Sequence, residues 1–221
     1  MFKTFILLSL ALVLASATRG VDIADFMGPY SVSQWQCLKN NGIDFAIIQI
    51  WRGGYHLSDH FTTDYNNAKA AGIQYVDAYA YIANNCRDNT AENICTSIKG
   101  ALPSGFAGML WLDVEDCSGC WTGTPAERLN YLINVADVCA AKGITLGVYS
   151  GNGSWSQVFG SASFASGALT KYPLWYAHYD NNPAMTDYSS IKFGSWSKPA
   201  IKQYNGDATL CGISGLDLDA Y

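Results

Sequence analysis

The chain has 221 residues, of which 49% are hydrophobic and 14% are charged, and its formal net charge is −5. This composition is typical of a folded globular domain and excludes a disordered chain or a coiled coil. Because an acidic chain offers no basic surface for phosphate groups, we expect no nucleic-acid partner.

The N-terminal segment has the pattern of a secretory signal peptide. Lys3 precedes an apolar run over residues 5–14, and three small residues follow at 15–17. We therefore divide the chain into a signal peptide over 1–17 and a single folded domain over 18–221. The apolar run is too short to span a bilayer, so we expect no membrane association. The expected location is secreted, or lysosomal or phagosomal.

A helix that ends at a glycine and is followed at once by an apolar strand recurs along the chain, at Gly42, Gly72 and Gly143. The expected strands cover residues 21–24, 45–51, 75–82, 109–114, 145–150, 174–179, 200–204 and 216–219. The expected helices cover residues 33–40, 59–71, 90–101 and 125–142. The last of these helices has the clearest start, because Thr124 and Glu127 can form a capping box.

Strands that alternate with helices along the whole chain predict a parallel sheet with helices outside it. Eight strands in about 200 residues favour an α/β fold of the modified TIM-like β/α barrel type. We expect a single domain in which some outer helices of the second half are short or missing. A doubly wound open sheet is the alternative, but residues 24–27 are not the glycine-rich turn that usually follows its first strand.

Two carboxylates share one face at the end of the strand over 109–114. Asp113 and Glu115 alternate with Leu112 and Val114, whose apolar side chains suit contact with helices. Active sites of β/α barrels are built at the C-terminal ends of strands, where this pair stands. Because neighbouring carboxylates raise one pKa of the pair, the two groups can supply an acid and a base. We interpret both residues as catalytic.

Further acids face the inside of the expected barrel. Closure of the barrel places the last strand beside the first, so we expect Asp22 and Asp217 to be neighbours. A single inward aspartate is more often a structural acid than a catalytic one, and this is our interpretation of Asp77 and Asp219.

Aromatic side chains stand near these acids, and core packing and stacking on sugar rings are equally consistent with their positions. They are Tyr79, Trp111, Tyr149, Trp175 and Tyr179. His56 and His60 stand four residues apart, which is a metal-binding spacing on a helix. No third ligand is evident, so we interpret them as loop and helix-start residues and expect no metal.

All seven cysteines lie after residue 17, which suits an oxidising compartment. We expect three disulfide bonds and one free thiol, with the pairing left open. Cys117 and Cys120 form a C-x-x-C pair. We interpret this pair as a structural bridge, because neither a thioredoxin-like frame nor further zinc ligands are evident.

Five segments taken in order resemble the lysozymes of glycoside hydrolase family 25. They are Gly20-Val21-Asp22-Ile23, Leu112-Asp113-Val114-Glu115, Leu174-Trp175-Tyr176-Ala177-His178-Tyr179, Gln203-Tyr204 and Gly215-Leu216-Asp217-Leu218-Asp219. The resemblance covers nearly the whole chain after residue 17 and implies a modified β/α barrel. It also implies hydrolysis of the β-1,4 bond between N-acetylmuramic acid and N-acetylglucosamine in bacterial peptidoglycan, without a cofactor.

The resemblance assigns roles to the inward acids. Glu115 becomes the proton donor, Asp113 orients the 2-acetamido group of the substrate, and Asp22 and Asp217 complete the acidic floor. The implied substrate-binding residues are Tyr79, Tyr149, Trp175, Tyr179 and Gln203.

The chain also departs from the usual pattern of that family. The common D-x-S-x-x-Q after the first strand is replaced by DIADFM at 22–27, and the common Y-H-F is replaced by YAY at 79–81. These changes leave the four acids in place but leave the subsite preferences open. A glycosylation sequon at Asn152-Gly153-Ser154 follows Tyr149 closely, and its occupancy is also left open.

Three other functions compete with a lysozyme. The first is a non-catalytic barrel that binds wall fragments or chitin-like glycans, but it need not keep all four acids. The second is a chitinase-like hydrolase, but the run before Asp113 is apolar rather than acidic. The third is a disulfide oxidoreductase built on Cys117 and Cys120.

We expect the protein to be a monomer. We also expect an acidic pH optimum, because an acidic enzyme is repelled from anionic bacterial walls at neutral pH.

Overall fold

The structure is a computed structural model that describes residues 17–87 and 89–221. The predicted signal peptide over 1–17 therefore lies almost wholly outside the described residues. Within the part of the chain that is described, no helix is both long and apolar enough to cross a membrane.

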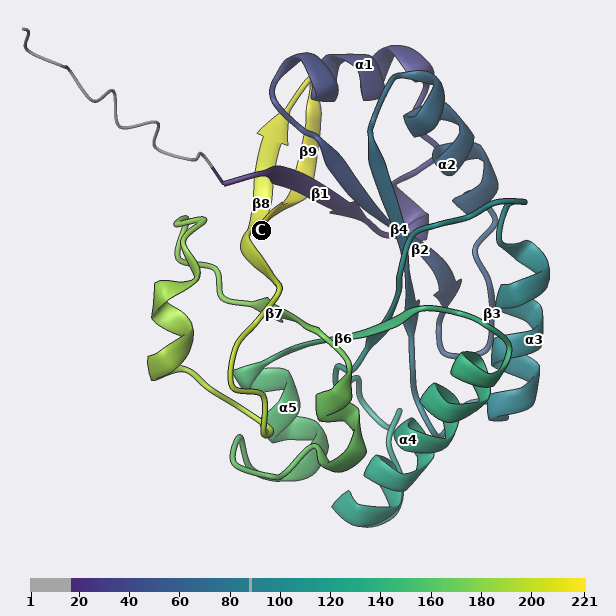
Figure 1. Cartoon of the computed structure of the whole chain (residues 1–221), viewed down its shortest axis with the longest axis vertical. Coiled ribbons are helices and arrows are strands. Elements are labelled where there is room, and N and C mark those ends of the chain that lie inside the picture. Colours follow the sequence, from purple (N-terminus) through teal and green to yellow (C-terminus); the bar gives the residue numbers. More distant parts are fainter. Residues whose placement is uncertain (1–16, 88) are drawn as a thin grey trace, which may run out of the picture.

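The strands of the described residues form one sheet that closes into a barrel (Figure 1). They are β1 (Arg19–Ile23), β2 (Phe45–Arg52), β3 (His56–Leu57), β4 (Tyr75–Tyr81), β5 (Leu110–Asp113), β6 (Leu146–Gly151), β7 (Leu174–Ala177), β8 (Ile201–Leu210) and β9 (Ile213–Ala220). The order around the barrel is β1-β9-β8-β7-β6-β5-β4-β2, and β1 pairs with β2 to close it. The short β3 extends the sheet from β2 and is not a barrel strand. The predicted barrel is confirmed.

The expectation of an all-parallel sheet is wrong at β9, which runs antiparallel to both β8 and β1. Cys211 and Gly212 connect β8 to β9 with φ angles of 59° and 74°. A two-residue loop with positive φ makes a tight hairpin, whereas a parallel crossover needs a dozen residues or more. The hairpin also lengthens both strands beyond the segments expected at 200–204 and 216–219. Barrel closure itself is confirmed, because Asp22 and Asp217 are directly paired across β1 and β9.

Helices cover the outside of the barrel mainly over the first part of the chain (Figure 1). They are α1 (Val32–Asn40), α2 (Phe61–Ala70), α3 (Ala91–Ala101), α4 (Pro125–Ala141) and α5 (Asn152–Phe159). After β7 the described residues contain only a 3-10 helix at Met185–Ser190 before β8. The expectation of short or missing helices in the second half is confirmed, and α5 is a helix that was not expected.

The start of α4 has the capping box expected from the sequence. The Thr124 hydroxyl accepts a hydrogen bond from the Glu127 backbone N–H at 3.3 Å, and the Glu127 carboxylate accepts one from the Thr124 N–H at 2.7 Å. Such a cap contributes about 1 kcal/mol to helix stability. It fixes the helix that returns the chain from β5 to β6.

The core has two layers. The larger layer lies between the barrel and the helices, and a smaller cluster fills the inside of the barrel. The inner cluster is Phe45, Ile47, Tyr79, Trp111, Tyr149, Trp175 and Ile201. Gly147 on β6 makes room for one of these rings, because a Cβ atom there would lie 2.2 Å from the Trp111 ring. The barrel interior is thus a packed aromatic floor rather than a pore.

The described residues contain three disulfide bonds and one free thiol, as expected. Cys37–Cys211 joins α1 to the β8–β9 turn, and Cys95–Cys139 joins α3 to α4. Cys117–Cys120 closes a short loop after β5, which agrees with the structural interpretation of that pair. Cys86 is the free cysteine.

Candidate active site

The nine residues predicted to be catalytic or substrate-binding line one cavity of about 110 Å³ at the mouth of the barrel. They are Asp22, Tyr79, Asp113, Glu115, Tyr149, Trp175, Tyr179, Gln203 and Asp217. Asp113 is the last residue of β5, and Glu115 follows in the loop after it. Asp113 and Glu115 therefore stand at the C-terminal end of a parallel strand, where barrel enzymes place their chemistry. The grouping of these residues agrees with the sequence prediction, and their individual roles stay predictions.

Gln203 connects the acids to the tyrosines. Its Nε2 donates hydrogen bonds to Asp22 Oδ2 at 2.7 Å and to Asp217 Oδ2 at 3.3 Å. Its Oε1 accepts hydrogen bonds from the Tyr149 hydroxyl at 2.6 Å and the Tyr179 hydroxyl at 2.8 Å. Both ends of the amide are engaged, so Gln203 holds the side chains that form the cavity wall.

Burial and mutual repulsion keep protons on this acidic cluster. Burial, followed by the charges of Glu115 and Asp22, raises the pKa of Asp113 well above its ordinary value. Burial, followed by the charge of Asp219, raises the pKa of Asp22 in the same way. No donor among the described residues reaches Asp113 Oδ1. The carboxyl groups therefore cannot all be ionised together, and the cluster holds both acids and bases.

Glu115 has the environment of a proton donor. Burial raises its pKa, and a hydrogen bond from the Ser154 hydroxyl to Oε1 at 3.4 Å partly opposes this effect. The backbone carbonyl of Glu115 accepts hydrogen bonds from Trp121 Nε1 at 2.8 Å and from the Tyr81 hydroxyl at 3.4 Å. These contacts fix the loop that carries the carboxyl group.

Asp77 and Asp219 have the structural contacts expected from the sequence. Asp77 accepts hydrogen bonds from the Met109 N–H at 2.9 Å and from Trp111 Nε1 at 2.8 Å. Asp219 is fully buried and accepts a hydrogen bond from Trp175 Nε1 at 2.8 Å. Burial raises the pKa of Asp219 to about 8, so it shares the protonated character of the cluster.

Two larger hollows adjoin the cavity. The first, of about 580 Å³, is lined by Ala24, Asp25, Phe26, Gln49, Arg52, Gly53, Tyr55, His56, Tyr79, Tyr81, Asp113, Glu115, Asp116 and Cys117, and we call it the aromatic arm. The second, of about 460 Å³, is lined by Glu115, Gly151, Asn152, Gly153, Ser154, Ala177, His178, Tyr179, Ser190 and Ile191, and we call it the polar arm. Glu115 lines the cavity and both arms, so a chain-like substrate could extend to either side of it.

Exposure separates the aromatic residues of the site. Tyr79, Trp111, Tyr149 and Trp175 are buried and belong to the inner core cluster, and all of them except Trp111 also line the cavity. Tyr179 is 57% exposed and is accessible for stacking on a sugar ring. Sequence reasoning missed Phe26 of the aromatic arm, which is 87% exposed. A large apolar side chain in the loop after the first strand was the signal that could have indicated it.

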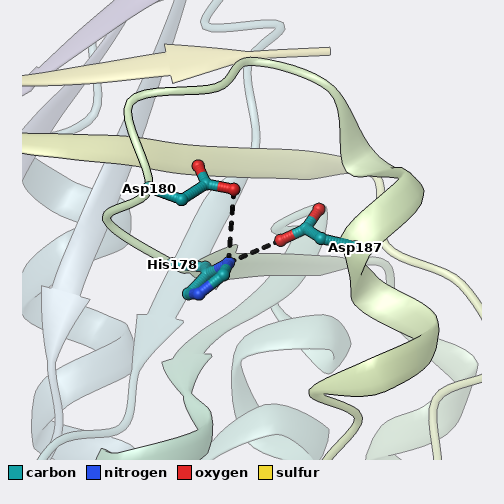
Figure 2. A group of neighbouring side chains, drawn as sticks. All are labelled: His178, Asp180 and Asp187. Carbon is teal, nitrogen blue, oxygen red and sulfur yellow. Dashed lines mark hydrogen bonds and ion pairs between the residues drawn. The ribbon is translucent and has the colours of Figure 1, made fainter.

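Figure 2 shows a cluster of one histidine and two aspartates beside the polar arm, with a spacing that suits metal ligands. His178 Nδ1 lies 2.6 Å from Asp187 Oδ2 and 3.5 Å from Asp180 Oδ2. The Lys202 ammonium lies 3.0 Å from Asp187 Oδ2 and 2.8 Å from Asp180 Oδ2. Because this ammonium already pairs with both carboxylates, we assign the cluster as an ion-pair network rather than a metal site. His60 lies at the start of α2, as interpreted from the sequence, but His56 belongs to the short strand β3 rather than to a loop.

Sequence comparisons place this chain among lysozyme-like proteins. A family profile described as Lysozyme-like protein 1 matches residues 15–204. Counting factor 50 of Dictyostelium discoideum is 37% identical over 223 residues, which cover 98% of this chain and 71% of that protein. Probable GH family 25 lysozyme 2 of the same organism is 34% identical, with 93% of this chain and 92% of that protein covered. This chain covers 41% of a longer relative, Probable GH family 25 lysozyme 3, at 39% identity.

Solved structures share the fold at lower identity. A bacterial lysozyme from Streptomyces coelicolor superposes with a TM-score of 0.73 and 21% identity, over 93% of this chain and 92% of the other. A family GH25 lysozyme from Aspergillus fumigatus has a TM-score of 0.72 and 20% identity, over 93% and 94% of the two chains. These structures support the barrel architecture described above.

Proposed function

Because the chain belongs to the lysozymes of glycoside hydrolase family 25, we propose that it hydrolyses the β-1,4 bond between N-acetylmuramic acid and N-acetylglucosamine in bacterial peptidoglycan. As a member of this family the chain is a glycoside hydrolase. The observation that carries the proposal is the position of Glu115, which lines the acidic cavity and both arms of the cleft. A glycan that spans the two arms would pass directly beside this proton donor.

Two similar solved structures support the choice of substrate. The modular autolysin LytC from Streptococcus pneumoniae was solved with a synthetic peptidoglycan ligand, and the Cpl-1 endolysin with a peptidoglycan analogue. Their TM-scores to this chain are 0.69 and 0.61, and both are 17% identical to it. This chain covers 46% and 54% of those modular proteins, and the shared barrel supports a peptidoglycan substrate for it.

In the proposed mechanism Glu115 donates its proton to the glycosidic oxygen as the bond breaks. Burial keeps that proton in place, because it raises the pKa of the carboxyl group. Asp113 orients the 2-acetamido group, whose carbonyl oxygen attacks the anomeric carbon in place of a protein nucleophile. Water then opens the cyclic intermediate with Glu115 as the base. Asp22 and Asp217, held by Gln203, complete the acidic floor.

We also propose that the chain acts as an exported monomer. Three disulfide bonds support an oxidising compartment, such as the extracellular space or a compartment of the secretory route. Export by this route would remove the predicted signal peptide over residues 1–17. Mass measurement of the protein purified from its native source tests whether the chain is cleaved after residue 17.

Digestion of purified peptidoglycan tests the function and the proton donor together. The native protein at acid pH should release fragments with muramic acid at the reducing end, read by mass spectrometry. Glu115→Gln keeps the shape of the side chain but cannot donate the proton, so the rate should fall by about 100-fold or more. Fragments that end in N-acetylglucosamine, or cleavage of chitin oligosaccharides alone, would indicate a different glycosidase.

The anomeric configuration of the first product tests the mechanism. Acetamido assistance inverts the anomeric carbon twice, so NMR of the fresh reducing end should show retention. An inverted product would instead require a water molecule activated by one of the acids, and it would rule out the assisted route.

A further inference from the structure

The ion-pair network of Figure 2 holds the ring of His178. The Asp187 carboxylate contacts His178 Nδ1 at 2.6 Å and accepts hydrogen bonds from the Tyr176 hydroxyl at 2.8 Å and the Lys202 ammonium at 3.0 Å. Lys202 also donates to Asp180 Oδ2 at 2.8 Å and to the Ala184 carbonyl at 3.2 Å. The ring of His178 is therefore positioned by groups from β7, β8 and the segment between them.

The network also determines which ring nitrogen is left for other contacts. Burial opposes the ionisation of Asp187, but hydrogen bonds from His178, Tyr176 and Lys202 lower its pKa to about 2. An ionised carboxylate can only accept, so His178 Nδ1 carries the hydrogen of this contact. Nε2 is therefore the ring nitrogen that is left for contacts in the polar arm. Among the described residues no hydrogen bond is made by Nε2, and Figure 2 shows the ring turned so that this nitrogen points away from both aspartates.

The accessible part of this network is in the cleft. The Lys202 side chain is 0% exposed, whereas the His178 side chain is 40% exposed and lines the polar arm together with Glu115 and Ser154. Burying an ammonium costs free energy that its ion pairs only partly offset. Nothing in the proposed hydrolysis steps uses Lys202, Asp180 or Asp187. A rigid support beneath one cleft side chain is the arrangement that precise substrate contacts need.

We propose that His178 is a substrate-binding residue of the polar arm, whose Nε2 makes a hydrogen bond with a hydroxyl or acetamido group of the bound glycan. This inference rests on the proposed function, because it assigns the occupant of that arm as the saccharide on one side of the scissile bond. Sugar hydroxyl groups both donate and accept hydrogen bonds, and an acetamido group has one donor and one acceptor, so either group can pair with this nitrogen. Asn152 and Ser190 line the same arm and make it polar on its other sides.

Two amide substitutions separate substrate contact from structural support. The amide of His178→Asn reaches about as far as Nδ1, so it can keep the bond to Asp187 while it leaves the polar arm without a hydrogen-bonding group at the Nε2 position. The amide of His178→Gln reaches about as far as Nε2, so it restores a hydrogen-bonding group in the arm and weakens the bond to Asp187. With soluble glycan fragments as substrate, His178→Asn should raise KM about fivefold to tenfold with kcat nearly unchanged. His178→Gln should restore KM to within about threefold of the native value.

A purely structural role predicts the reverse pattern. In that case His178→Asn keeps the native KM, and His178→Gln has the lower melting temperature and the weaker binding, which would overturn the inference. Calorimetric titration of a tetrasaccharide of alternating N-acetylglucosamine and N-acetylmuramic acid reads binding without hydrolysis when Glu115→Gln is the parent protein and each His178 substitution is added to it. If Glu115→Gln binds this probe but the native protein does not cleave it, the proposed function fails while the binding data still decide the role of His178. Equal binding by Glu115→Gln and both of its His178 variants would also overturn the inference.

Discussion

The Glu115 carboxyl group receives a hydrogen bond from the hydroxyl of Ser154, which lies in the first turn of α5. The two residues are 39 positions apart, and β6 and α5 meet at Gly151 without any intervening loop. This junction brings the start of α5 to the C-terminal end of the barrel, beside the loop after β5. Ser154 therefore acts on Glu115 as a positioning residue that favours the ionised carboxylate.

Removal of the Ser154 hydroxyl should shift the pH dependence of catalysis. In Ser154→Ala, burial acts on Glu115 without opposition, so its pKa rises further and the basic limb of the kcat/KM profile moves to higher pH. Ser154→Thr keeps the hydroxyl and should retain the native profile. Both proteins should be made in a host that adds no N-glycan, because Ser154→Ala also removes the Asn152 sequon. An unchanged basic limb in Ser154→Ala would show that the hydrogen bond is not made in solution.

At the residue scale the sequence predicts the position of a side chain where strand alternation and a motif agree. Side chains alternate between the two faces of a strand, so the inward orientation of Asp113 and Glu115 could be predicted from the sequence. Ser154 and His178 could not, because their contacts depend on loops that bring distant segments together. The limit applies to Phe26 in part: its apolar side chain after the first strand was a signal, but the sequence does not show that its loop lies beside the loops after β2 and β4.

At the element scale the β8–β9 hairpin decides how the barrel closes. Its tight turn contains Cys211, which is bonded to Cys37 in α1 across 174 positions of sequence. The bond fastens the last two strands to the first helix, next to the seam between β1 and β9. The seam also pairs Asp22 with Asp217, so the bond supports the acidic site indirectly.

Loss of this long-range disulfide should cost more stability than loss of the short one. Replacing Cys37 and Cys211 together by alanine should lower the free energy of unfolding by about 2–4 kcal/mol, because the unfolded chain gains the entropy of a large open loop. Replacing Cys117 and Cys120 together is the matched control, since that bond closes a loop of few residues. Urea unfolding measures both. Equal losses would contradict the loop-entropy explanation.

The helices and strands were predicted correctly where residues that end or cap a helix mark the boundary of the element. The glycine that ends a helix and the apolar strand after it identified β2, β4 and β6, and the capping box identified α4. The antiparallel course of β9 was missed because apolar alternation carries no strand direction. The start of α5 was missed because Asn152-Gly153-Ser154 has the composition of a turn and Gly151 offers no capping side chain. Tertiary burial of Trp155 and Phe159 stabilises that helix instead.

At the scale of the whole molecule the charges form two groups with opposite responses to pH. The acids of the barrel mouth have raised pKa values, which reach about 8 for Asp217 and Asp219. Below a pH of about 4 these groups are protonated in the folded and the unfolded chain alike. As the pH rises towards about 8 the unfolded chain holds fewer protons than the folded chain, so stability falls. Asp187 acts in the opposite direction, because its stabilising contribution is lost as the pH falls towards about 2.

The free energy of unfolding should therefore be greatest in the acid range and decline up to about pH 8. Asp219→Asn keeps an acceptor for Trp175 Nε1 but removes one of the titrating groups. The free energy of unfolding of both proteins should fall between pH 5 and about 8. The fall should be smaller in this variant than in the native protein, by about 1.4 kcal/mol or more, which corresponds to one pKa unit. Denaturant unfolding at several pH values gives the comparison. Parallel curves for the two proteins would contradict the raised pKa of Asp219.

Closure through β9 also has a consequence for how this barrel can be combined with other modules. The backbone of Thr18 exchanges hydrogen bonds with that of Tyr221, at 3.1 Å and 3.2 Å, where β1 begins and β9 ends. Since the cleft lies at the opposite ends of the parallel strands, a domain attached before Thr18 or after Tyr221 starts from the face away from the substrate. A short peptide joining these two positions would make a cyclic protein with the same cleft, and fusion partners could be exchanged there without blocking the path of the glycan.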